Sequence, residues 1–180
     1  QSRHNIGFLA VDLLLSRWGV SRSSARSKFG SELYQAEHKG QKIQLQKPME
    51  YMNVSGGPVQ RAMAFFRIEP DHLIVVHDDI DLDLRRVKLK QGGGHGGHNG
   101  LRSISLAIGS EYLRVRGGVG RPGGGGGKQD RVVGHVLGSF SRAEQATVGV
   151  QLAFMADAIE AIIDRGMTYA MNHFNVVAPP

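Results

Sequence analysis

Cysteine is absent from this 180-residue sequence. Its absence excludes a thiol nucleophile, a disulfide framework and a metal site built on thiolates, and it is compatible with a reducing cytoplasm, where we expect the protein. No apolar run approaches the roughly 18 residues that span a bilayer, so we expect no membrane contact. No signal peptide is visible, and the sequence opens at Gln1 rather than methionine, so we expect the natural N-terminus to lie upstream.

Acidic residues are the scarcer charged class, with 16 Asp and Glu against 22 Lys and Arg and a net charge of +6. This excess predicts a polyanionic partner, with phosphate as the favoured anion. The basic residues flank one glycine-rich stretch, residues 92–100. Those before it are Arg85, Arg86, Lys88 and Lys90, and those after it are Arg102, Arg114, Arg116 and Arg121.

Hydrophobic periodicity and turn residues predict strands that alternate with helices. The expected helices cover residues 7–17, 58–66, 101–108 and 142–165, the last opened by a capping box at Ser141 and Glu144. The expected strands cover residues 31–36, 42–46, 73–76, 87–91 and 113–119, with a turn at residues 38–41 and with 73–76 buried on both faces. The pattern indicates an α/β protein and one domain over residues 1–180.

The glycine-rich stretch from Gly92 to Gly100 is the clearest candidate for a site. Its six glycines surround His95, His98 and Asn99. Glycine adopts backbone conformations that other residues resist and lets a ligand approach the main chain, but it costs conformational entropy on folding. So many glycines together therefore indicate a functional loop.

Three polar clusters stand at the ends of apolar segments. They are Arg3-His4-Asn5, Tyr51-Met52-Asn53 and His77-Asp78-Asp79, the last expected just after the buried strand. A histidine paired with a carboxylate can act as a general base, and asparagine amides can donate hydrogen bonds to an oxyanion. The chain thus contains the groups needed for acyl hydrolysis by water. Composition does not say which histidine pairs with which aspartate.

Competing interpretations are weaker. Ser55 lacks the first glycine of a nucleophile elbow, and a hydroxyl at a helix start is favoured for it. A metal site formed by His95, His98, His77 and Asp78 and a nucleotide cradle in the glycine loop are both disfavoured. The remaining histidines are expected to be solvated or structurally bonded: His38, His72, His135 and His173. No chemistry is assigned to the five glycines at residues 123–127.

Four motifs in this order and spacing resemble the bacterial-type peptidyl-tRNA hydrolase family over residues 1 to about 174. They are Arg3-His4-Asn5-Ile6-Gly7, Lys47-Pro48 with Tyr51-Met52-Asn53-x-Ser55-Gly56, His77-Asp78-Asp79-x-Asp81-Leu82, and residues 92–101. The resemblance implies a single three-layer α/β domain with a mixed, twisted central sheet flanked by helices. It also implies hydrolysis of the ester between a peptide and the 3′-terminal ribose of tRNA, which recycles tRNA from stalled or aborted translation.

The resemblance also implies roles for individual residues. His4 would activate water and Asp78 would orient His4. Asn53 and Asn99 would bind substrate, beside Tyr51, Met52 and His98 around the site. Lys88, Lys90 and Arg116 would hold the tRNA phosphate. No metal and no organic cofactor is implied, and the expected partner of a monomeric enzyme is the acceptor stem and 3′ end of peptidyl-tRNA.

Two departures from the family pattern concern the start and one strand. The family has a strand and a Gly-Leu-Gly-Asn-Pro-Gly turn before Arg-His-Asn, so we expect that strand to be missing here. Gly117 stands where the family carries isoleucine, which predicts an under-packed sheet. Two alternatives stay open: a non-catalytic RNA-binding scaffold of the same fold, and a metal-dependent hydrolase that uses His95 and His98.

Overall fold

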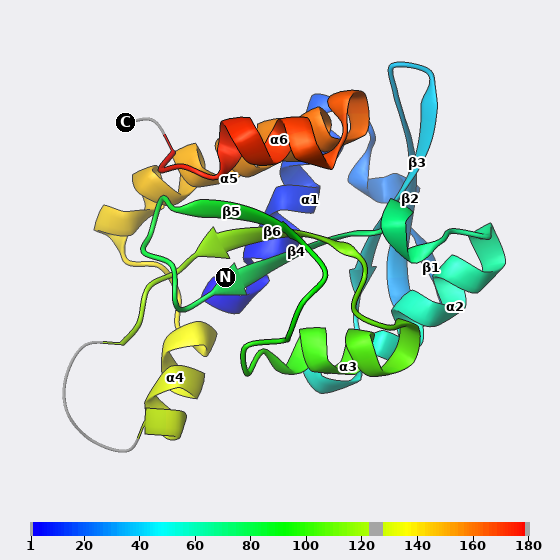
Figure 1. Cartoon of the computed structure of the whole chain (residues 1–180). Helices are drawn as coiled ribbons and strands as arrows, with labels where there is room; N and C mark the ends of the chain where they lie inside the picture. Colours follow the sequence, from blue (N-terminus) through cyan, green and yellow to red (C-terminus); the bar gives the residue numbers. More distant parts are fainter. Residues whose placement is uncertain (1, 123–127, 179–180) are drawn as a thin grey trace. The chain divides into compact units, whose positions relative to one another are not determined.

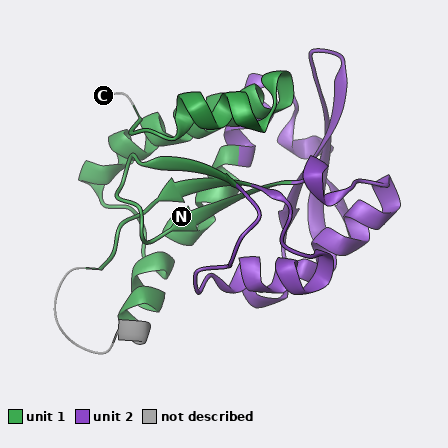
Figure 2. Cartoon of the chain, in the orientation of Figure 1, with its two compact units in different colours: residues 1–10, 74–90, 114–180 green, residues 11–73, 91–113 purple. Residues whose placement is uncertain are grey.

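A computed structural model describes residues 2–122 and 128–178, so the five-glycine segment lies outside the described residues. The chain divides into two compact units (Figure 2). Unit 1 comprises Gln1–Ala10, Ile74–Lys90 and Arg114–Pro180, and unit 2 comprises Val11–Leu73 and Gln91–Leu113. The single domain expected over residues 1–180 stays a prediction.

The helices and strands follow one another as labelled in Figure 1. In chain order they are α1 (Ile6–Arg17), β1 (Arg26–Lys28), β2 (Ser31–His38), β3 (Gln41–Pro48), α2 (Gly56–Phe66), β4 (Ile74–Asp79), β5 (Val87–Gln91), α3 (Asn99–Ile108), β6 (Leu113–Gly118), α4 (Lys128–Leu137), α5 (Arg142–Arg165) and α6 (Met167–Phe174). Short 3₁₀ helices also occur at Arg3–Asn5, Arg22–Ser24, Met52–Val54 and Pro70–His72. The predicted α/β class is confirmed.

One sheet has the strand order β4-β6-β5. The Leu113 amide donates to the Leu73 carbonyl, and the Val119 amide donates to the Asp79 carbonyl. From the first contact to the second, the residue number increases on both strands, so β4 and β6 are parallel. The β6–β5 pair runs the other way, as the next contacts show.

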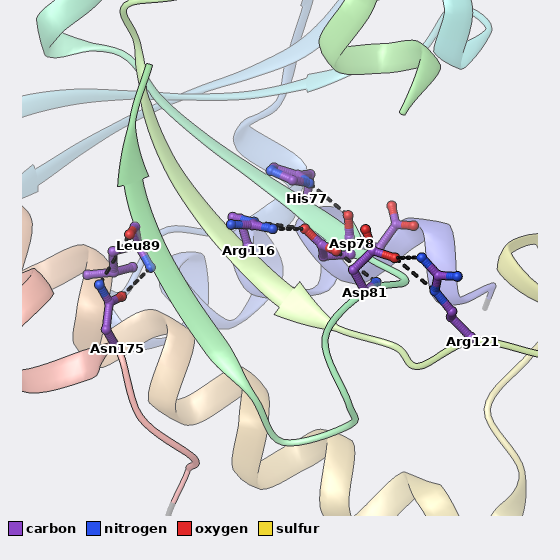
Figure 3. Close-up of polar contacts among 8 residues, drawn as sticks. His77, Asp78, Asp81, Leu89, Arg116, Arg121 and Asn175 are labelled. Carbon is purple, nitrogen blue, oxygen red and sulfur yellow. Dashed lines mark hydrogen bonds and ion pairs between the residues drawn. The ribbon is translucent and has the colours of Figure 1, made fainter. Parts of the chain in front are cut away.

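The Gly118 amide donates to the Arg86 carbonyl, and the Gly92 amide donates to the Tyr112 carbonyl. One residue number rises while the other falls, so β5 and β6 are antiparallel. The sheet is therefore mixed, as predicted. The arrowheads in Figure 3 show β5 pointing opposite to β4 and β6.

Strand β4 differs from its prediction in two ways. His77-Asp78-Asp79 form the end of the strand rather than the loop after it. Its apolar residues Ile74, Val75 and Val76 are only half-buried, whereas the sequence predicted burial on both faces. Among the described residues β4 lies at the edge of its sheet, and its buried residues are the polar His77 and Asp78 instead.

Helix α5 of unit 1 begins and ends where the sequence predicts. The Ser141 hydroxyl accepts from the Glu144 amide and the Glu144 carboxylate accepts from the Ser141 amide, which is the predicted capping box. Gly166 ends the helix with a φ of 84°. Among the described residues α5 is long and apolar enough to cross a membrane by length and composition alone, contrary to the expectation that no such run exists. Buried core helices pass the same test, and α5 buries one face within unit 1.

The buried face of α5 also explains Gly117. A Cβ on Gly117 would lie 2.8 Å from the Met155 sulfur and 3.0 Å from the Ile6 Cδ1, and both of these side chains are fully buried. The space that a larger strand residue would fill is therefore occupied, and the predicted under-packing is wrong. Gln151, also fully buried, donates to the Gly118 carbonyl at 2.9 Å and accepts from the Arg85 amide at 3.1 Å.

The capping box predicts a pH dependence of stability. The hydrogen bond from the Ser141 backbone amide, followed by the Ser141 side chain and Arg3, lowers the pKa of Glu144. Ionised Glu144 therefore stabilises the fold above the ordinary glutamate pKa of about 4.3, and this stabilisation is lost as pH falls through the lowered pKa. Glu144→Gln should reduce the free energy of unfolding by about 0.5–2 kcal/mol at pH 7 and by progressively less in acid.

Urea unfolding of the wild type and Glu144→Gln between pH 3 and 7 would measure this difference. The exposed Glu69 offers a control, and Glu69→Gln should change little at any pH. A Glu144→Gln deficit that stays constant down to pH 3 would contradict the assignment.

Unit 2 contains an antiparallel sheet in the order β1-β2-β3. Lys39 and Gly40 both have positive φ, 49° and 80°, and form the two-residue turn predicted between β2 and β3. Such a pair is typical of the type I′ hairpin turn, whose twist matches that of the strands. Phe29 and Gly30, also with positive φ, connect β1 to β2.

A buried ion pair in unit 2 attaches α1 to β3. The Lys47 ammonium pairs with the Asp12 carboxylate and lies 5.7 Å from the centre of the buried Tyr34 ring. Burial, and then a hydrogen bond to Glu32, raise the pKa of the Tyr34 phenol. Lys47 belongs to the Lys-Pro motif just before Tyr51-Met52-Asn53, so the pair fixes the strand that leads into that cluster.

The four histidines expected to be solvated or structurally bonded have structural contacts. His38 packs against the Trp18 ring with centroids 5.2 Å apart. His72 lies 2.7 Å from the Asp71 carboxylate and His135 lies 3.0 Å from the Val119 carbonyl. The fourth, His173, contacts the carbonyl of Tyr169 at 2.8 Å.

Candidate active site

Unit 1 brings His4 and Asp78 together across 74 residues of sequence. His4 lies in the 3₁₀ helix before α1, and Asp78 lies at the end of β4. The His4 Nδ1 is 2.6 Å from Asp78 Oδ1, and the exposed fractions of the two side chains are 16% and 3%. The close approach of α1 to β4 requires glycine at position 7, because a Cβ there would lie 2.3 Å from the Val76 carbonyl oxygen.

Arg3 fixes the backbone beside His4. Its guanidinium donates to the Ser139 carbonyl at 2.7 Å and to the Glu144 carboxylate at 2.8 Å. The Arg3 amide also donates to the Gly138 carbonyl at 2.9 Å. Glu144 therefore serves two purposes, because it caps α5 and holds the residue next to His4.

The pairing of His4 with Asp78 determines which ring nitrogen can do chemistry. An ionised carboxylate can only accept, so His4 Nδ1 carries the proton that is shared with Asp78. Nε2 is then the nitrogen with the lone pair, and it is the atom that could take a proton from water. Asp78 would stabilise the imidazolium that results.

Next to this pair, His77 and Asp79 have structural partners. His77 Nδ1 lies 2.7 Å from the Asp78 carbonyl oxygen, and Arg116 Nε donates to Asp79 Oδ2 at 2.7 Å (Figure 3). Asp79 thus neutralises part of the charge of Arg116, whose side chain is 22% exposed. Figure 3 also shows Asp81 paired with Arg121.

Basic side chains gather on one face of the unit 1 sheet. The hydrogen bonds that pair β5 with β6 place Lys88 opposite Arg116 and Lys90 opposite Arg114, and opposite residues of a strand pair lie on the same face. Lys88 and Lys90 are exposed, whereas Arg114 is buried. The outer edge of β5 is covered by Asn175, whose side chain accepts from the Leu89 amide at 2.5 Å and donates back to its carbonyl at 3.3 Å (Figure 3).

Unit 2 brings Asn53 and Asn99 into the lining of one cavity of about 570 Å³. Asn53 lies in the 3₁₀ helix before α2, and Asn99 begins α3. The two helices approach closely at Gly56, whose amide donates to the Ser103 hydroxyl at 2.9 Å. The full lining is Glu50, Asn53, Val54, Gly57, Arg61, Asn99, Arg102, Ser103, Leu106 and Ala107.

His98 caps the helix that carries Asn99. Its Nδ1 accepts from the Leu101 amide at 3.2 Å, so the proton of the neutral ring is on Nε2. The glycine loop that leads to it has positive φ at four of its glycines, namely Gly92, Gly93, Gly96 and Gly97. His95 accepts from the Gly97 amide at 3.1 Å within the same loop.

Tyr51 and Met52 lie beside Asn53 in different surroundings. Tyr51 is 86% exposed. Met52 packs on the start of α3, because a Cβ on Gly100 would lie 2.6 Å from its sulfur. Ser55 is buried and its hydroxyl donates to the Met52 carbonyl at 2.9 Å. The prediction of a hydroxyl at a helix start is confirmed, because Ser55 is at the N-cap of α2, although its side chain bonds backward rather than into the helix.

The predicted site residues thus fall into two groups. Unit 1 holds His4, Asp78, Lys88, Lys90 and Arg116, and unit 2 holds Tyr51, Met52, Asn53, His98 and Asn99. Arg61 and Ser103 were not predicted, although both line the cavity with the two amides. Ser103 could have been found if the expected helix had been started at Asn99, because Ser103 then lies one turn after it.

The family model described as peptidyl-tRNA hydrolase matches residues 1–179. This chain belongs to the peptidyl-tRNA hydrolase family. The peptidyl-tRNA hydrolase of Bifidobacterium adolescentis is 42% identical over 177 residues, which is 97% of this chain and 89% of that relative. The enzyme of Nocardia farcinica is 44% identical over 176 residues, with coverage of 97% and 89%.

The fold also agrees with solved structures of the family. The crystal structure of peptidyl-tRNA hydrolase from Acinetobacter baumannii matches with a TM-score of 0.90 at 34% identity, covering 100% of this chain and 89% of that one. The resemblance inferred from four short motifs is therefore confirmed over the whole chain.

Proposed function

We propose that this chain hydrolyses the ester bond between a peptide, or an N-blocked aminoacyl group, and the 3′-terminal ribose of tRNA, and so releases tRNA for reuse in translation. Peptidyl-tRNA is the substrate of the family to which the chain belongs. The observation that carries the assignment to particular residues is the 2.6 Å contact between His4 Nδ1 and Asp78 Oδ1. It provides an oriented imidazole, which is the general base that ester hydrolysis needs.

In the proposed reaction, His4 Nε2 takes a proton from water while the water oxygen bonds to the ester carbonyl carbon. The tetrahedral intermediate then collapses, and the carbon–oxygen bond to the ribose breaks. The departing ribose oxygen takes the proton back from His4, leaving a carboxylic acid and free tRNA. Asp78 keeps the proton of the neutral ring on Nδ1, so that Nε2 can accept the proton from water, and it stabilises the transient imidazolium.

Asn53 and Asn99 are assigned to the substrate carbonyl. Their amide N–H groups can donate to the oxygen that becomes negative in the intermediate, and such donors typically contribute about 10²–10³ in rate. Their location in one cavity lining supports a common role. Tyr51, Met52 and His98 are assigned to the surroundings of these amides, where the Tyr51 side chain is exposed and His98 caps the start of α3.

Lys88, Lys90 and Arg116 are assigned to the tRNA phosphates near the acceptor stem. The cross-strand placement of Lys88 and Arg116 supports a shared phosphate contact, and the two exposed lysines are free to follow the backbone. Arg116 would share its charge between Asp79 and the phosphate. We further propose that the enzyme works as a monomer and in the cytoplasm, where ribosomes make its substrate.

Release of labelled N-acetyl-aminoacyl groups from tRNA, with and without EDTA, tests the proposal. We expect turnover that EDTA does not change. Loss of turnover with EDTA would instead support a metal-dependent hydrolase that uses His95 and His98. Tight binding of tRNA with no ester cleavage would contradict the enzyme and support a non-catalytic RNA-binding scaffold.

A further inference from the structure

The lining of the unit 2 cavity includes one positively charged side chain, Arg102, that has no role in the proposed reaction. Arg102 lines the cavity with Asn53 and Asn99. Within residues 2–122 and 128–178, the side chains of these three residues make no hydrogen bond or ion pair to other side chains or to the backbone. Unpaired donors that border one cavity are available to a ligand.

Helix geometry places Arg102 on the Asn99 side of α3. Residues three apart on a helix are neighbours, with Cβ atoms about 5–6 Å apart. Leu106, 82% exposed, continues the same side of the helix. The helix therefore presents an amide, a guanidinium and an apolar side chain in succession along the cavity.

The cavity lining also includes an ion pair between Arg61 and Glu50. Arg61 donates to the Glu50 carboxylate at 3.1 Å and to the Phe29 carbonyl at 3.0 Å, so its guanidinium is already engaged. Two arginines against one glutamate leave the lining with a net positive charge. An anion is therefore the favoured ligand, and Arg102 is the group left to bind it.

We propose that this cavity is a subsite for the phosphodiester group that joins the last two nucleotides of the substrate RNA, with Arg102 as its ligand. The proposal rests on the function proposed above, which assigns Asn53 and Asn99 to the ester carbonyl. The ester and this phosphodiester belong to the same terminal nucleotide. Every peptidyl-tRNA carries that phosphate, whereas an acidic side chain occurs in only some peptides, so a fixed cation in the cavity suits the phosphate.

The apolar part of the lining fits the same ligand. Val54 and Leu106 line the cavity, and their side chains are exposed to 42% and 82%. Apolar side chains can cover the flat face of a base or a ribose beside the phosphate. A single-stranded 3′ end offers both surfaces, because its bases are not enclosed in a helix.

Binding of a short RNA hairpin with a CCA 3′ end, carrying N-acetyl-alanine through a non-hydrolysable amide, would test the proposal. Arg102→Gln should weaken binding about tenfold and reduce the slope of log affinity against log salt by about 0.7, one single-strand phosphate contact. Arg102→Lys should recover part of the affinity. Lys42→Gln, an equal charge change on an exposed residue of β3, should leave affinity within about twofold.

A second probe identifies the group that Arg102 contacts. With a neutral methylphosphonate in place of the last phosphodiester, wild-type binding should fall about tenfold and Arg102→Gln should cause no further loss. If Arg102→Gln weakened binding of the phosphodiester probe and of the methylphosphonate probe by the same factor, the proposal would be overturned. A loss confined to a probe with N-acetyl-aspartate would show that Arg102 binds acidic peptides instead.

Turnover of N-acetyl-alanyl-tRNA by the wild type, measured in parallel, separates this proposal from the proposed function. Absent turnover contradicts the proposed function, while the binding of the two probes still tests Arg102. Turnover together with unchanged binding by Arg102→Gln overturns only the phosphate subsite.

Discussion

His4→Ala should lower kcat/KM for N-acetyl-aminoacyl-tRNA by about 10²–10⁴, the usual contribution of a general base. The physical reason is that alanine leaves no group to take a proton from the attacking water. Initial rates of ester cleavage, at substrate concentrations below and above KM, would measure the loss. Affinity for tRNA should persist, because the basic side chains of β5 and β6 are untouched.

A matched histidine control comes from His72, which is exposed and bonded to Asp71 at the protein surface. His72→Ala should leave kcat/KM within about twofold, as expected for a surface substitution. If His4→Ala kept wild-type turnover, the proposed base would be wrong. If both variants lost activity together with thermal stability, folding rather than chemistry would explain the loss.

Asp78→Asn should lower kcat by up to about 10⁴, the loss that the same change causes in a Ser-His-Asp hydrolase. Asparagine has nearly the same shape as aspartate, but its amide can donate to His4 Nδ1. The proton of the neutral ring would then move to Nε2, the atom that must accept a proton from water. Rapid-mixing measurements of the cleavage step at saturating substrate would reveal the change.

The double variant His4→Ala/Asp78→Asn tests whether Asp78 acts by orienting His4 or whether its replacement disturbs the site independently of His4. If Asp78 acts through His4, the double variant should be no slower than His4→Ala alone. Additive losses would contradict this coupling. Asp81→Asn supplies the matched control, because Asp81 is paired with Arg121 and is 51% exposed, and its activity should stay near wild type.

Local signals in the sequence predicted most of the elements that border the site. The Ser141 capping box and Gly166 set both ends of α5, and the Lys39-Gly40 turn set the β2–β3 hairpin. These succeeded because each depends on neighbouring residues alone. The motif at His77-Asp78-Asp79 was recognised, but its place inside β4 was not.

Elements without a strong local pattern were missed. Strand β1 consists of Arg-Ser-Lys, three exposed residues that are extended only because they pair with β2. Helix α6 starts directly after Gly166. The glycine indicates the end of α5, so the sequence gives no separate signal for the start of another helix. Helix α4 begins with four polar residues directly after the glycine segment, so no apolar periodicity announces it.

The sequence by itself determined the family, the class of reaction and the residue types available for it, because motif order and spacing are properties of the chain alone. The family resemblance implied that Asp78 orients His4, and the tertiary structure supplies the contact itself, with His4 Nδ1 2.6 Å from Asp78 Oδ1. Only the tertiary structure decided that Arg102 and Asn99 share a cavity with Asn53. It also decided that Met155 fills the space beside Gly117. These contacts join residues far apart in the chain, and their formation depends on how strands and helices pack rather than on any local propensity.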